Sequence, residues 1–225
     1  MTDRVIAITG GHGVLGRAVL EAAMADGLKV AVIDHAMGHA TPDGVLEVGG
    51  VDLTDPAQAG QAIAAVIGRF GRLDALLNIA GGFVWQTTDD AEPAWDRMHA
   101  LNVTTALNAS RAALPHLKAS GEGRIVNVGS AAALKAGAGM GAYGAAKAGV
   151  HALTQALAKE LKASSVTVNA VLPSIIDTPA NHKDMPDADP AQWVAPNDLA
   201  AVILFLASPQ SRAMTGALVP VTGRV

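Results

Sequence analysis

The chain has 225 residues and a formal net charge of −4; half of its residues are hydrophobic, only 3% are aromatic and none is cysteine. This balance argues against the clustered lysines and arginines with which proteins bind nucleic acids and anionic lipids, and the lack of cysteine excludes disulfides, thiolate nucleophiles and cysteine-based zinc sites. The length suits one α/β domain, so we expect a single domain over residues 1–225 that acts on a small molecule.

The amino-terminal segment has only five apolar residues before a run of glycines. That stretch is too short for the core of a signal peptide, and no run in the chain approaches the roughly 18 apolar residues of a membrane span. We therefore expect a cytoplasmic protein with no membrane partner.

Seven short apolar runs, rich in β-branched residues, are each typical of a buried strand. Between them lie segments whose apolar residues recur at helical spacing, as Val150, Leu153 and Leu157 do. This alternation predicts an α/β fold in which helices cover both faces of a parallel sheet. The predicted strands are Val5–Thr9, Lys29–Ile33, Val45–Val51, Leu73–Asn78, Arg124–Val128, Ser165–Leu172 and Ala217–Val221.

The first predicted strand runs into TGGHGVLG, which places Gly10, Gly13 and Gly16 at a turn between a strand and a helix. Glycine permits a tight turn and a close approach of backbone amides to a pyrophosphate, and the amino terminus of the helix adds partial positive charge. Read from Gly11 the spacing is the dinucleotide fingerprint G-x-G-x-x-G, and read from Gly10 it is G-x-x-G-x-x-G. The loop therefore predicts an anion site for a dinucleotide.

Acidic residues follow the second and third predicted strands. Asp34 lies where the dinucleotide fingerprint has a carboxylate for the adenosine ribose, and that charge would repel a 2′-phosphate. NAD(H) is therefore expected rather than NADP(H), although Asp34 could also be an ordinary turn residue. Asp52 either holds the adenine amino group or caps the helix that begins near Pro56.

The only tyrosine, Tyr143, precedes Lys147 by four residues on one predicted helix, so the two share a helix face. A cation within about 4–6 Å lowers the pKa of an acid by roughly 1–3 units, which brings a phenol from its usual pKa of about 10 toward neutrality. A phenol tuned in this way can serve as a general acid or base.

Prolines and aspartates interrupt the chain between Ser174 and Asn197. A structureless insertion of this length in a compact domain is usually functional, so residues 174–197 are predicted to form a mobile substrate lid. The alternative is a surface linker without a role.

Several spaced motifs then point to one family. Ser130 precedes Tyr143 by thirteen residues and ends the strand of RIVNVGS. Further stretches are TGGHGVLG, the Asn78-Ile79-Ala80-Gly81 segment, the LNV that contains Asn102, and NAVLP followed by Thr178. In this order the motifs resemble those of the short-chain dehydrogenase/reductase family, over nearly the whole chain from Arg4 to Gly223.

The resemblance implies a three-layer, doubly wound Rossmann-like fold with a seven-stranded parallel sheet, a nicotinamide cofactor and hydride transfer. By similarity, Tyr143 exchanges a proton with the substrate, Ser130 hydrogen-bonds the reacting oxygen, and Lys147 lowers the pKa of Tyr143 and holds the nicotinamide ribose. Asn102, on a helix expected over residues 92–117, would hold a water in a proton relay to Lys147. The cofactor-binding residues that the resemblance implies are Gly10, Gly13, Leu15, Gly16, Asp34, Asp52, Leu53, Ala80, Gly81, Tyr143, Lys147, Pro173, Ile176 and Thr178.

The chain also departs from the ordinary pattern of that family. Val14 stands where ordinary members have glycine, and the 10/13/16 spacing resembles the extended members, many of which are epimerases or dehydratases. Ile79 replaces a common second asparagine, and Ser174 replaces the glycine that usually follows the proline. Three stretches are similar to dihydropteridine reductase, which would imply reduction of a quinonoid pterin by NADH: AGGFVW, GMGAYGAAKAGVH and VLPSIIDTPANHKDMPDADPAQW.

Other residues are less specific. Phe83, Trp85, Met140, Met185 and Trp193 could line a substrate pocket or pack in the core and lid. His12 is expected to be exposed in its loop, and His35 and His39 lack a third ligand, so no metal site is predicted. The small residues of the Tyr143 helix resemble the subunit interface of the family and imply a homodimer or homotetramer: Ala145, Ala146, Ala148, Gly149 and Ala152.

The main hypothesis is thus an NAD(H)-dependent oxidoreductase that acts on a small carbonyl compound or alcohol. Two alternatives remain from other classes of protein. One is a dinucleotide sensor without turnover, against which the intact Ser130, Tyr143 and Lys147 argue. The other is an epimerase or dehydratase that retains its nicotinamide.

Overall fold

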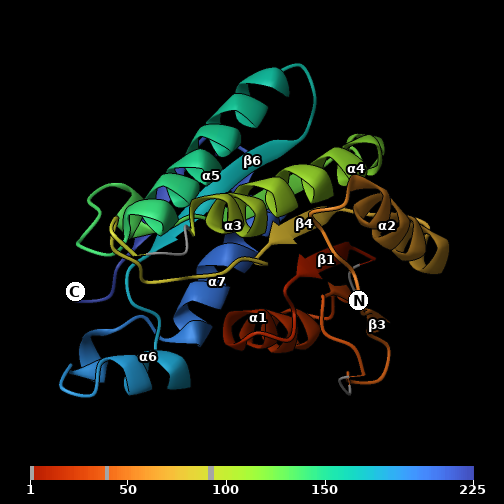
Figure 1. Cartoon of the computed structure of the whole chain (residues 1–225). Coiled ribbons are helices and arrows are strands. Elements are labelled where there is room, and N and C mark those ends of the chain that lie inside the picture. Colours follow the sequence, from red (N-terminus) through yellow and green to blue (C-terminus); the bar gives the residue numbers. More distant parts are fainter. Residues whose placement is uncertain (1–2, 39–40, 91–93) are drawn as a thin grey trace.

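The computed structural model describes residues 3–38, 41–90 and 94–225. Within these ranges, seven parallel strands form one sheet in the order β3-β2-β1-β4-β5-β6-β7 (Figure 1). The strands are β1 Val5–Thr9, β2 Lys29–Ile33, β3 Leu46–Val48, β4 Ala75–Asn78, β5 Arg124–Val128, β6 Thr167–Pro173 and β7 Leu218–Val221. The predicted doubly wound parallel fold is confirmed.

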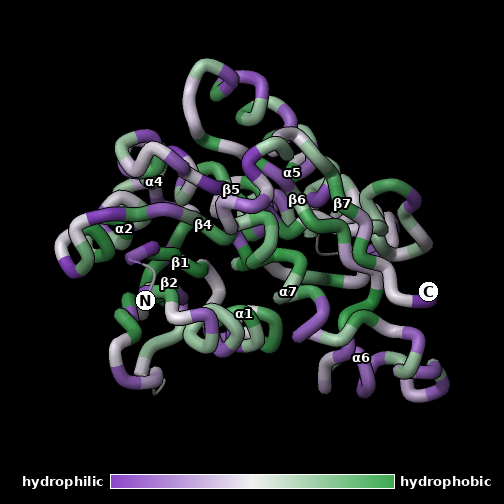
Figure 2. The backbone as a smooth tube through the Cα atoms, turned by 180° about the vertical axis from the view of Figure 1, so that it is seen from behind, coloured by the Kyte–Doolittle hydropathy of each residue, from purple (hydrophilic) through white to green (hydrophobic). Residues whose placement is uncertain are grey.

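Helices cover both faces of the sheet (Figures 1 and 2). The strand residues alternate between the two cores. Ile6 and Ile8 of β1 pack toward α1 and α7, whereas Val5 and Ala7 pack toward α2, α4 and α5. The helices are α1 Val14–Ala25, α2 Pro56–Phe70, α3 Trp95–His99, α4 Thr105–Ala119, α5 Gly141–Glu160, α6 Pro179–Asp184 and α7 Pro196–Ala207. In the described part of the chain, no helix is long and apolar enough to cross a membrane.

The third strand is shorter than predicted and ends at Val48 rather than Val51. Gly50 has a φ of +72°, a left-handed conformation in which the chain turns away from the extended path. The apolar run continues through this turn because Val51 is buried in the core beyond the strand.

The helix expected over residues 92–117 is not one continuous α-helix. Its first predicted residues lie outside the described ranges, and the described part consists of α3, a π-helical turn over Ala100–Thr104, and α4. The turn contains the buried Asn102, whose Nδ2 donates to the Met98 carbonyl at 3.0 Å and to the Gly82 carbonyl at 3.0 Å. Single π-turns inside helices are frequent at functional sites.

The expectation that residues 174–197 lack secondary structure is wrong. The segment holds α6 and a 3₁₀-helix over Pro190–Gln192, and a β-bridge joins Ile176 to Val194. Thr178 and Asp189 cap the two helices with their side chains, and a proline follows each cap. Proline is favoured at the first helical position, so the prolines that suggest an irregular segment start short helices instead.

A chain of buried polar side chains ties the two central strands to α5. Asn78 Nδ2 donates to Asn127 Oδ1 at 2.8 Å and to Ser110 Oγ at 3.1 Å. Asn127 Nδ2 in turn donates to Thr154 Oγ1 of α5 at 2.8 Å. Because buried polar groups cost free energy unless they are paired, this chain fixes how β4, β5 and α5 meet.

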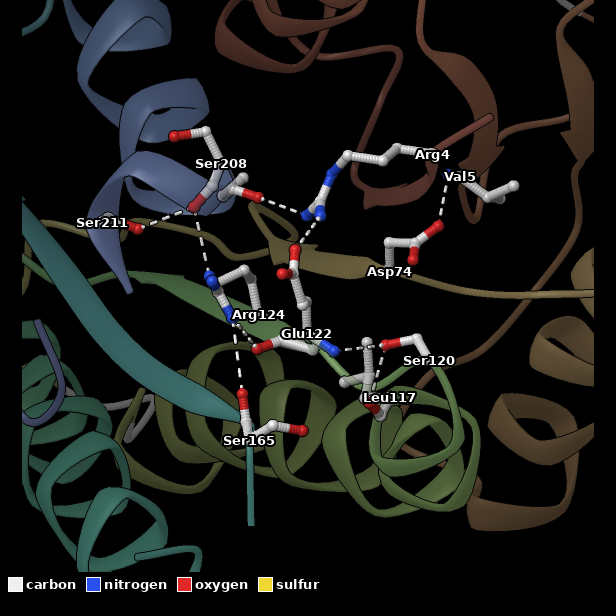
Figure 3. Close-up of polar contacts among 12 residues, drawn as sticks. Arg4, Val5, Asp74, Leu117, Ser120, Glu122, Arg124, Ser165, Ser208 and Ser211 are labelled. Carbon is white, nitrogen blue, oxygen red and sulfur yellow. Dashed lines mark hydrogen bonds and ion pairs between the residues drawn. The ribbon is translucent and has the colours of Figure 1, made fainter. Parts of the chain in front are cut away.

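Two arginines hold the carboxyl end of α7 at the opposite edge of the sheet from the glycine loop (Figure 3). Arg124, at the start of β5, is 2% exposed and donates to the carbonyls of Ser208, Gly123 and Ser165. Arg4 donates to the Ala207 carbonyl at 2.9 Å. A cation at the carboxyl end of a helix satisfies its free carbonyls and interacts favourably with its dipole.

We predict that Arg124→Met lowers the free energy of unfolding by about 2–3 kcal/mol, because three carbonyls lose a charged donor inside the protein. Arg4→Met is the matched control, since Arg4 serves one carbonyl of the same helix end and is less buried. Urea denaturation followed by circular dichroism measures both losses. Equal stability of Arg124→Met and the wild type would contradict the anchoring role.

Candidate active site

A cavity of about 990 Å³ opens at the carboxyl edge of the sheet. It lies where the loops after β1 and β4 diverge, because the strand order reverses direction between these two strands. Open α/β sheets bind ligands at such switch points. The cavity is therefore the candidate site for a dinucleotide.

The glycine loop fits closely against the loop after β4. Gly10 has a φ of +68°, and a Cβ there would lie 2.8 Å from the backbone of Ala80. A Cβ on Gly16 would lie 2.2 Å from the Gly10 carbonyl oxygen, so the loop can fold back on α1 only with glycine at this position. Gly13 is the N-cap of α1, and the amino terminus of this helix borders the cavity. Helix amino termini bind phosphates, so the predicted anion site has the required geometry.

Asp34 directly follows β2 and lines the same cavity. Its Oδ2 accepts the His12 N–H at 2.9 Å, and its Oδ1 accepts the Ala36 N–H at 3.0 Å. Each carboxylate oxygen retains a second lone pair for a ligand hydroxyl. Arg17, the basic residue at the start of α1, donates its Nε to the His12 carbonyl at 3.0 Å.

The exposure expected for His12 is wrong. Its side chain is only 8% exposed, and its Nε2 lies 3.2 Å from Glu47 Oε1 on β3. The loop turns this imidazole toward the neighbouring strands rather than toward solvent. The contact joins the glycine loop to the edge of the sheet beside Asp34.

Asp52 does not cap α2, because Asp55 occupies that position and accepts the Ala57 N–H at 2.8 Å. The capping alternative for Asp52 is thus wrong. Its Oδ1 accepts from the backbone and the hydroxyl of Thr54, and these bonds lower the pKa of Asp52. Asp52 is exposed and lines the cavity, where it stays ionised.

The three residues of the predicted catalytic group come together beside this cavity. Ser130 follows β5, and its hydroxyl forms a side-chain hydrogen bond with Tyr143, which lies near the start of α5. Lys147 lies one turn later and donates its Nζ to the Val128 carbonyl at 2.8 Å. The Nζ is 5.8 Å from the centre of the Tyr143 ring. Val128 itself lines the cavity, so the amine lies at its wall.

The expected lowering of the Tyr143 pKa is not what this structure shows. Burial raises the pKa of Tyr143 above its usual value, and the hydrogen bond with Ser130 only partly opposes this. Burial also lowers the pKa of Lys147 to about 8. Desolvation disfavours the charged form of both groups, and the helical spacing of Tyr143 and Lys147 does not reveal this effect.

Asn102 lies near Lys147 but holds the backbone in this structure. Its Oδ1 accepts the Gly82 N–H at 3.3 Å, while its Nδ2 donates to the Gly82 carbonyl. A Cβ built on Gly81 would lie 2.6 Å from Asn102 Oδ1 and 3.4 Å from Lys147 Nζ. The two side chains therefore meet over Gly81, where only a glycine leaves room for both.

Most of the predicted cofactor residues line the cavity. Those that do are Gly10, Gly13, Leu15, Gly16, Asp34, Asp52, Leu53, Ala80, Gly81, Ile176 and Thr178. Lys147 lies beyond its wall at Gly81 and Val128, and neither Tyr143 nor Pro173, the last residue of β6, is among the lining residues. The cavity is also lined by residues that the sequence motifs do not indicate: Val14, Ile33, His35, Val51, Thr54, Ile79, Leu101, Thr105, Val128, Pro179 and Ala180. Most of these residues are next to a predicted residue in the sequence. Adjacency to a motif is therefore the only sequence signal that could have identified them as cavity residues.

The large apolar residues divide into two groups. Phe83 is 51% exposed and meets the Tyr143 ring edge to face with the ring centres 5.0 Å apart, and Trp85 is 60% exposed. Trp193 is buried against His182 in the segment after β6. Met140 and Met185 are half-buried. Phe83 thus flanks the phenol, whereas the Trp85 Nε1 donates to the Ala138 carbonyl at 3.1 Å. Trp193 anchors the 174–197 segment.

Metal binding finds no support in the described residues, which hold no group of three or more histidines, cysteines or acids suited to an ion. Of the two histidines considered from the sequence, His35 lines the cavity and His39 lies outside the described ranges.

Known proteins are similar to this chain in sequence and in fold. The family model for short chain dehydrogenases matches residues 4–189. The chain is 35% identical to a 2-(S)-hydroxypropyl-CoM dehydrogenase of Xanthobacter autotrophicus, over 99% of this chain and 96% of that protein. Among solved structures it resembles levodione reductase (TM-score 0.89, 28% identity, 99% and 97% of the two chains). It also resembles a 3-ketoacyl-(acyl-carrier-protein) reductase from Brucella melitensis complexed with NADH (TM-score 0.87, 29% identity, 98% of each chain).

The matched residues include the glycine loop, Ser130, Tyr143 and Lys147. The relatives cover the chain almost from end to end and are dehydrogenases or reductases. The chain is a member of the short-chain dehydrogenase/reductase family of oxidoreductases.

Proposed function

We propose that the protein is an NAD(H)-dependent oxidoreductase that reduces a small carbonyl compound, or oxidises the matching alcohol, with Tyr143 as the general acid or base. The observation that carries this proposal is the convergence of Tyr143, Ser130 and Lys147 beside the cavity of the glycine loop. Family membership supports the class of reaction.

The residues present fit a dinucleotide. The close approach of the Gly10 loop to Ala80 leaves backbone amides at the amino terminus of α1 for the pyrophosphate, and Asp34 has free lone pairs for ribose hydroxyls. Ile176 and Thr178 would lie beside the nicotinamide end, with Asp52 and Leu53 at the adenine end. The cofactor would supply or accept the hydride.

In reduction, the Tyr143 hydroxyl donates a proton to the carbonyl oxygen while Ser130 hydrogen-bonds that oxygen. The raised pKa keeps Tyr143 protonated at neutral pH, which favours its use as the proton donor. The resulting phenolate is stabilised by the Lys147 ammonium one helical turn away. Asn102, next to Lys147, would hold a water that returns the proton.

Three further features belong to the proposal. Residues 174–197 would act as a substrate lid that is built from short helices and anchored by Trp193. Ala145, Ala148 and Ala152 lie exposed along α5 and would form part of a homodimer or homotetramer interface, whereas Gly149 packs on Val103 of its own chain. The cytoplasmic location and the single domain over residues 1–225 stay predictions from the sequence.

Tyr143→Phe is predicted to lower kcat for NADH-dependent carbonyl reduction by about 100- to 10,000-fold, because a positioned proton donor is lost. A panel of ketones that includes a quinonoid dihydropterin, followed at the NADH absorbance, measures this. NADH binding of the variant, measured by fluorescence, is the control for folding. Unchanged turnover would remove Tyr143 from the mechanism.

The same panel separates the alternatives. Substrate that isomerises or loses water without net NADH consumption would favour the epimerase or dehydratase. Tight NADH binding with no turnover of any compound would favour the dinucleotide sensor. Turnover confined to the quinonoid dihydropterin would identify the dihydropteridine reductase activity.

The preference for NADH over NADPH is predicted to be about 100-fold or more in kcat/KM, because a like charge opposite Asp34 costs several kcal/mol and each 1.4 kcal/mol is tenfold. Asp34→Asn should narrow this gap by removing the charge. The matched control is Asp52→Asn, which is expected to change kcat/KM with NADH and kcat/KM with NADPH by the same factor. Wild-type protein that uses NADPH as well as NADH would overturn the prediction.

The pH profile of reduction follows from the Lys147 pKa of about 8. Below this pH the ammonium is charged and stabilises the phenolate; above it the charge is lost while Tyr143 remains protonated. We therefore expect kcat/KM for reduction to be level near neutrality and to fall as the pH rises past about 8. Lys147→Arg, which keeps its charge, should move the fall to higher pH. A wild-type profile that is flat across this range, or an identical profile in the arginine variant, contradicts the assignment.

A further inference from the structure

His151 lies one helical turn after Lys147 on α5 and is buried beneath the catalytic serine. His151 is 6% exposed, and its Nε2 accepts the Ser130 backbone N–H at 3.3 Å. Neither the sequence motifs nor the mechanism above uses this histidine. Because an unpaired buried N–H costs free energy, the imidazole has a defined task at Ser130.

Gly129 leaves the space that the imidazole fills. A Cβ built on Gly129 would lie 2.4 Å from His151 Nε2 and 2.7 Å from its Cδ2. Real Cβ atoms do not approach other atoms so closely, so the ring and the missing methyl exclude each other. A glycine is therefore needed at position 129, before the catalytic serine, to leave room for the imidazole. This need does not depend on the backbone conformation of Gly129.

Two side chains of α5 hold the end of β5 on either side of this glycine. Lys147 Nζ donates to the Val128 carbonyl, and His151 Nε2 accepts from the Ser130 amide. The Gly129 amide is held from the other side by the Val171 carbonyl at 2.8 Å. The three residues 128–130 therefore have a fixed path, and that path determines where the Ser130 hydroxyl meets Tyr143.

The bond from Ser130 also fixes the state of the histidine. Nε2 can accept only with its lone pair free, so the ring is neutral with its proton on Nδ1. Burial lowers the pKa of His151, and the nearby Lys147 charge lowers it further. Both effects keep the acceptor available at neutral pH.

We propose that His151 is a positioning residue for Ser130: as the neutral Nδ1-protonated tautomer, it holds the serine backbone through Nε2 in the space left by Gly129. The role of Ser130 in this statement rests on the proposed function. The tautomer and the contact do not.

The kinetic test compares two substitutions of similar size. His151→Leu removes the acceptor and is expected to lower kcat about 10- to 100-fold, because a reacting group displaced by about 1 Å can cost about 100-fold. His151→Gln keeps an acceptor oxygen near the position of Nε2 and should restore most of the kcat. Both should leave the NADH dissociation constant near the wild-type value. Leu157→Ala, a buried change two turns further along α5, should lower stability with kcat unchanged.

A leucine variant with wild-type kcat, or a glutamine variant no better than the leucine variant, would overturn the positioning role. Gly129→Ala supplies an independent arm, since its methyl would displace the imidazole and should reproduce the loss seen in His151→Leu. When Gly129→Ala and His151→Leu are combined, the loss of kcat should be smaller than the product of the two separate fold losses, as expected for groups that share one contact.

A measurement without substrate keeps the inference separate from the reaction. In protein labelled with ¹⁵N histidine, the His151 signals should show an unprotonated Nε2 and a protonated Nδ1 at neutral pH. A proton on Nε2 would overturn the proposal whatever the enzyme does. If no carbonyl compound is turned over but this tautomer is found, the proposed function fails and the contact stands.

Discussion

The buried ammonium of Lys147 is the constraint around which the rest of the site is arranged. A charge in a protein interior is tolerated only where it is hydrogen-bonded, and the described acceptor here is the Val128 carbonyl at the end of β5. This bond sets the position of α5 along the sheet. Because Tyr143 lies one turn before Lys147 and His151 one turn after it, the same bond also sets where the phenol meets Ser130 and where the imidazole fits beside Gly129.

Close packing of the backbone connects Tyr143, Ser130 and Lys147 to the cavity of the glycine loop. Gly10 contacts the chain at Ala80, and the next residue, Gly81, lies under both Asn102 and Lys147. A side chain at either glycine would separate the glycine loop from the amine. The loops after β1 and β4 therefore act as one wall, with the predicted anion site on one side and Lys147 on the other.

Sequence patterns captured the parts that depend on local chemistry. β-branched runs located the strands, and Gly10 and Gly16 occupy the tight contacts that their spacing predicts. The sequence patterns gave wrong predictions where groups distant in the sequence determine the local structure or the pKa. The His12 imidazole is turned inward because its Nε2 pairs with the carboxylate of Glu47 on β3. Residues 174–197 form short helices because Thr178 and Asp189 cap them. The direction of the Tyr143 pKa shift depends on burial. A helical spacing of four residues carries no information about burial.

Strand β5 connects the stability of the fold to the precision of the site. Its first residue, Arg124, binds the end of α7 at one edge of the sheet, and its last residue, Val128, receives Lys147 at the other. Five residues separate these edges by only about 13 Å at 3.3 Å per residue, and the strand pairs in register with β4 and β6 along its length. A slip by one residue would turn every side chain of the strand to the wrong face and break both anchors together. Ser130, which follows β5, is thus held by groups at both ends of a short, stiff element. Its hydroxyl therefore keeps its place although it follows the strand rather than lying within it.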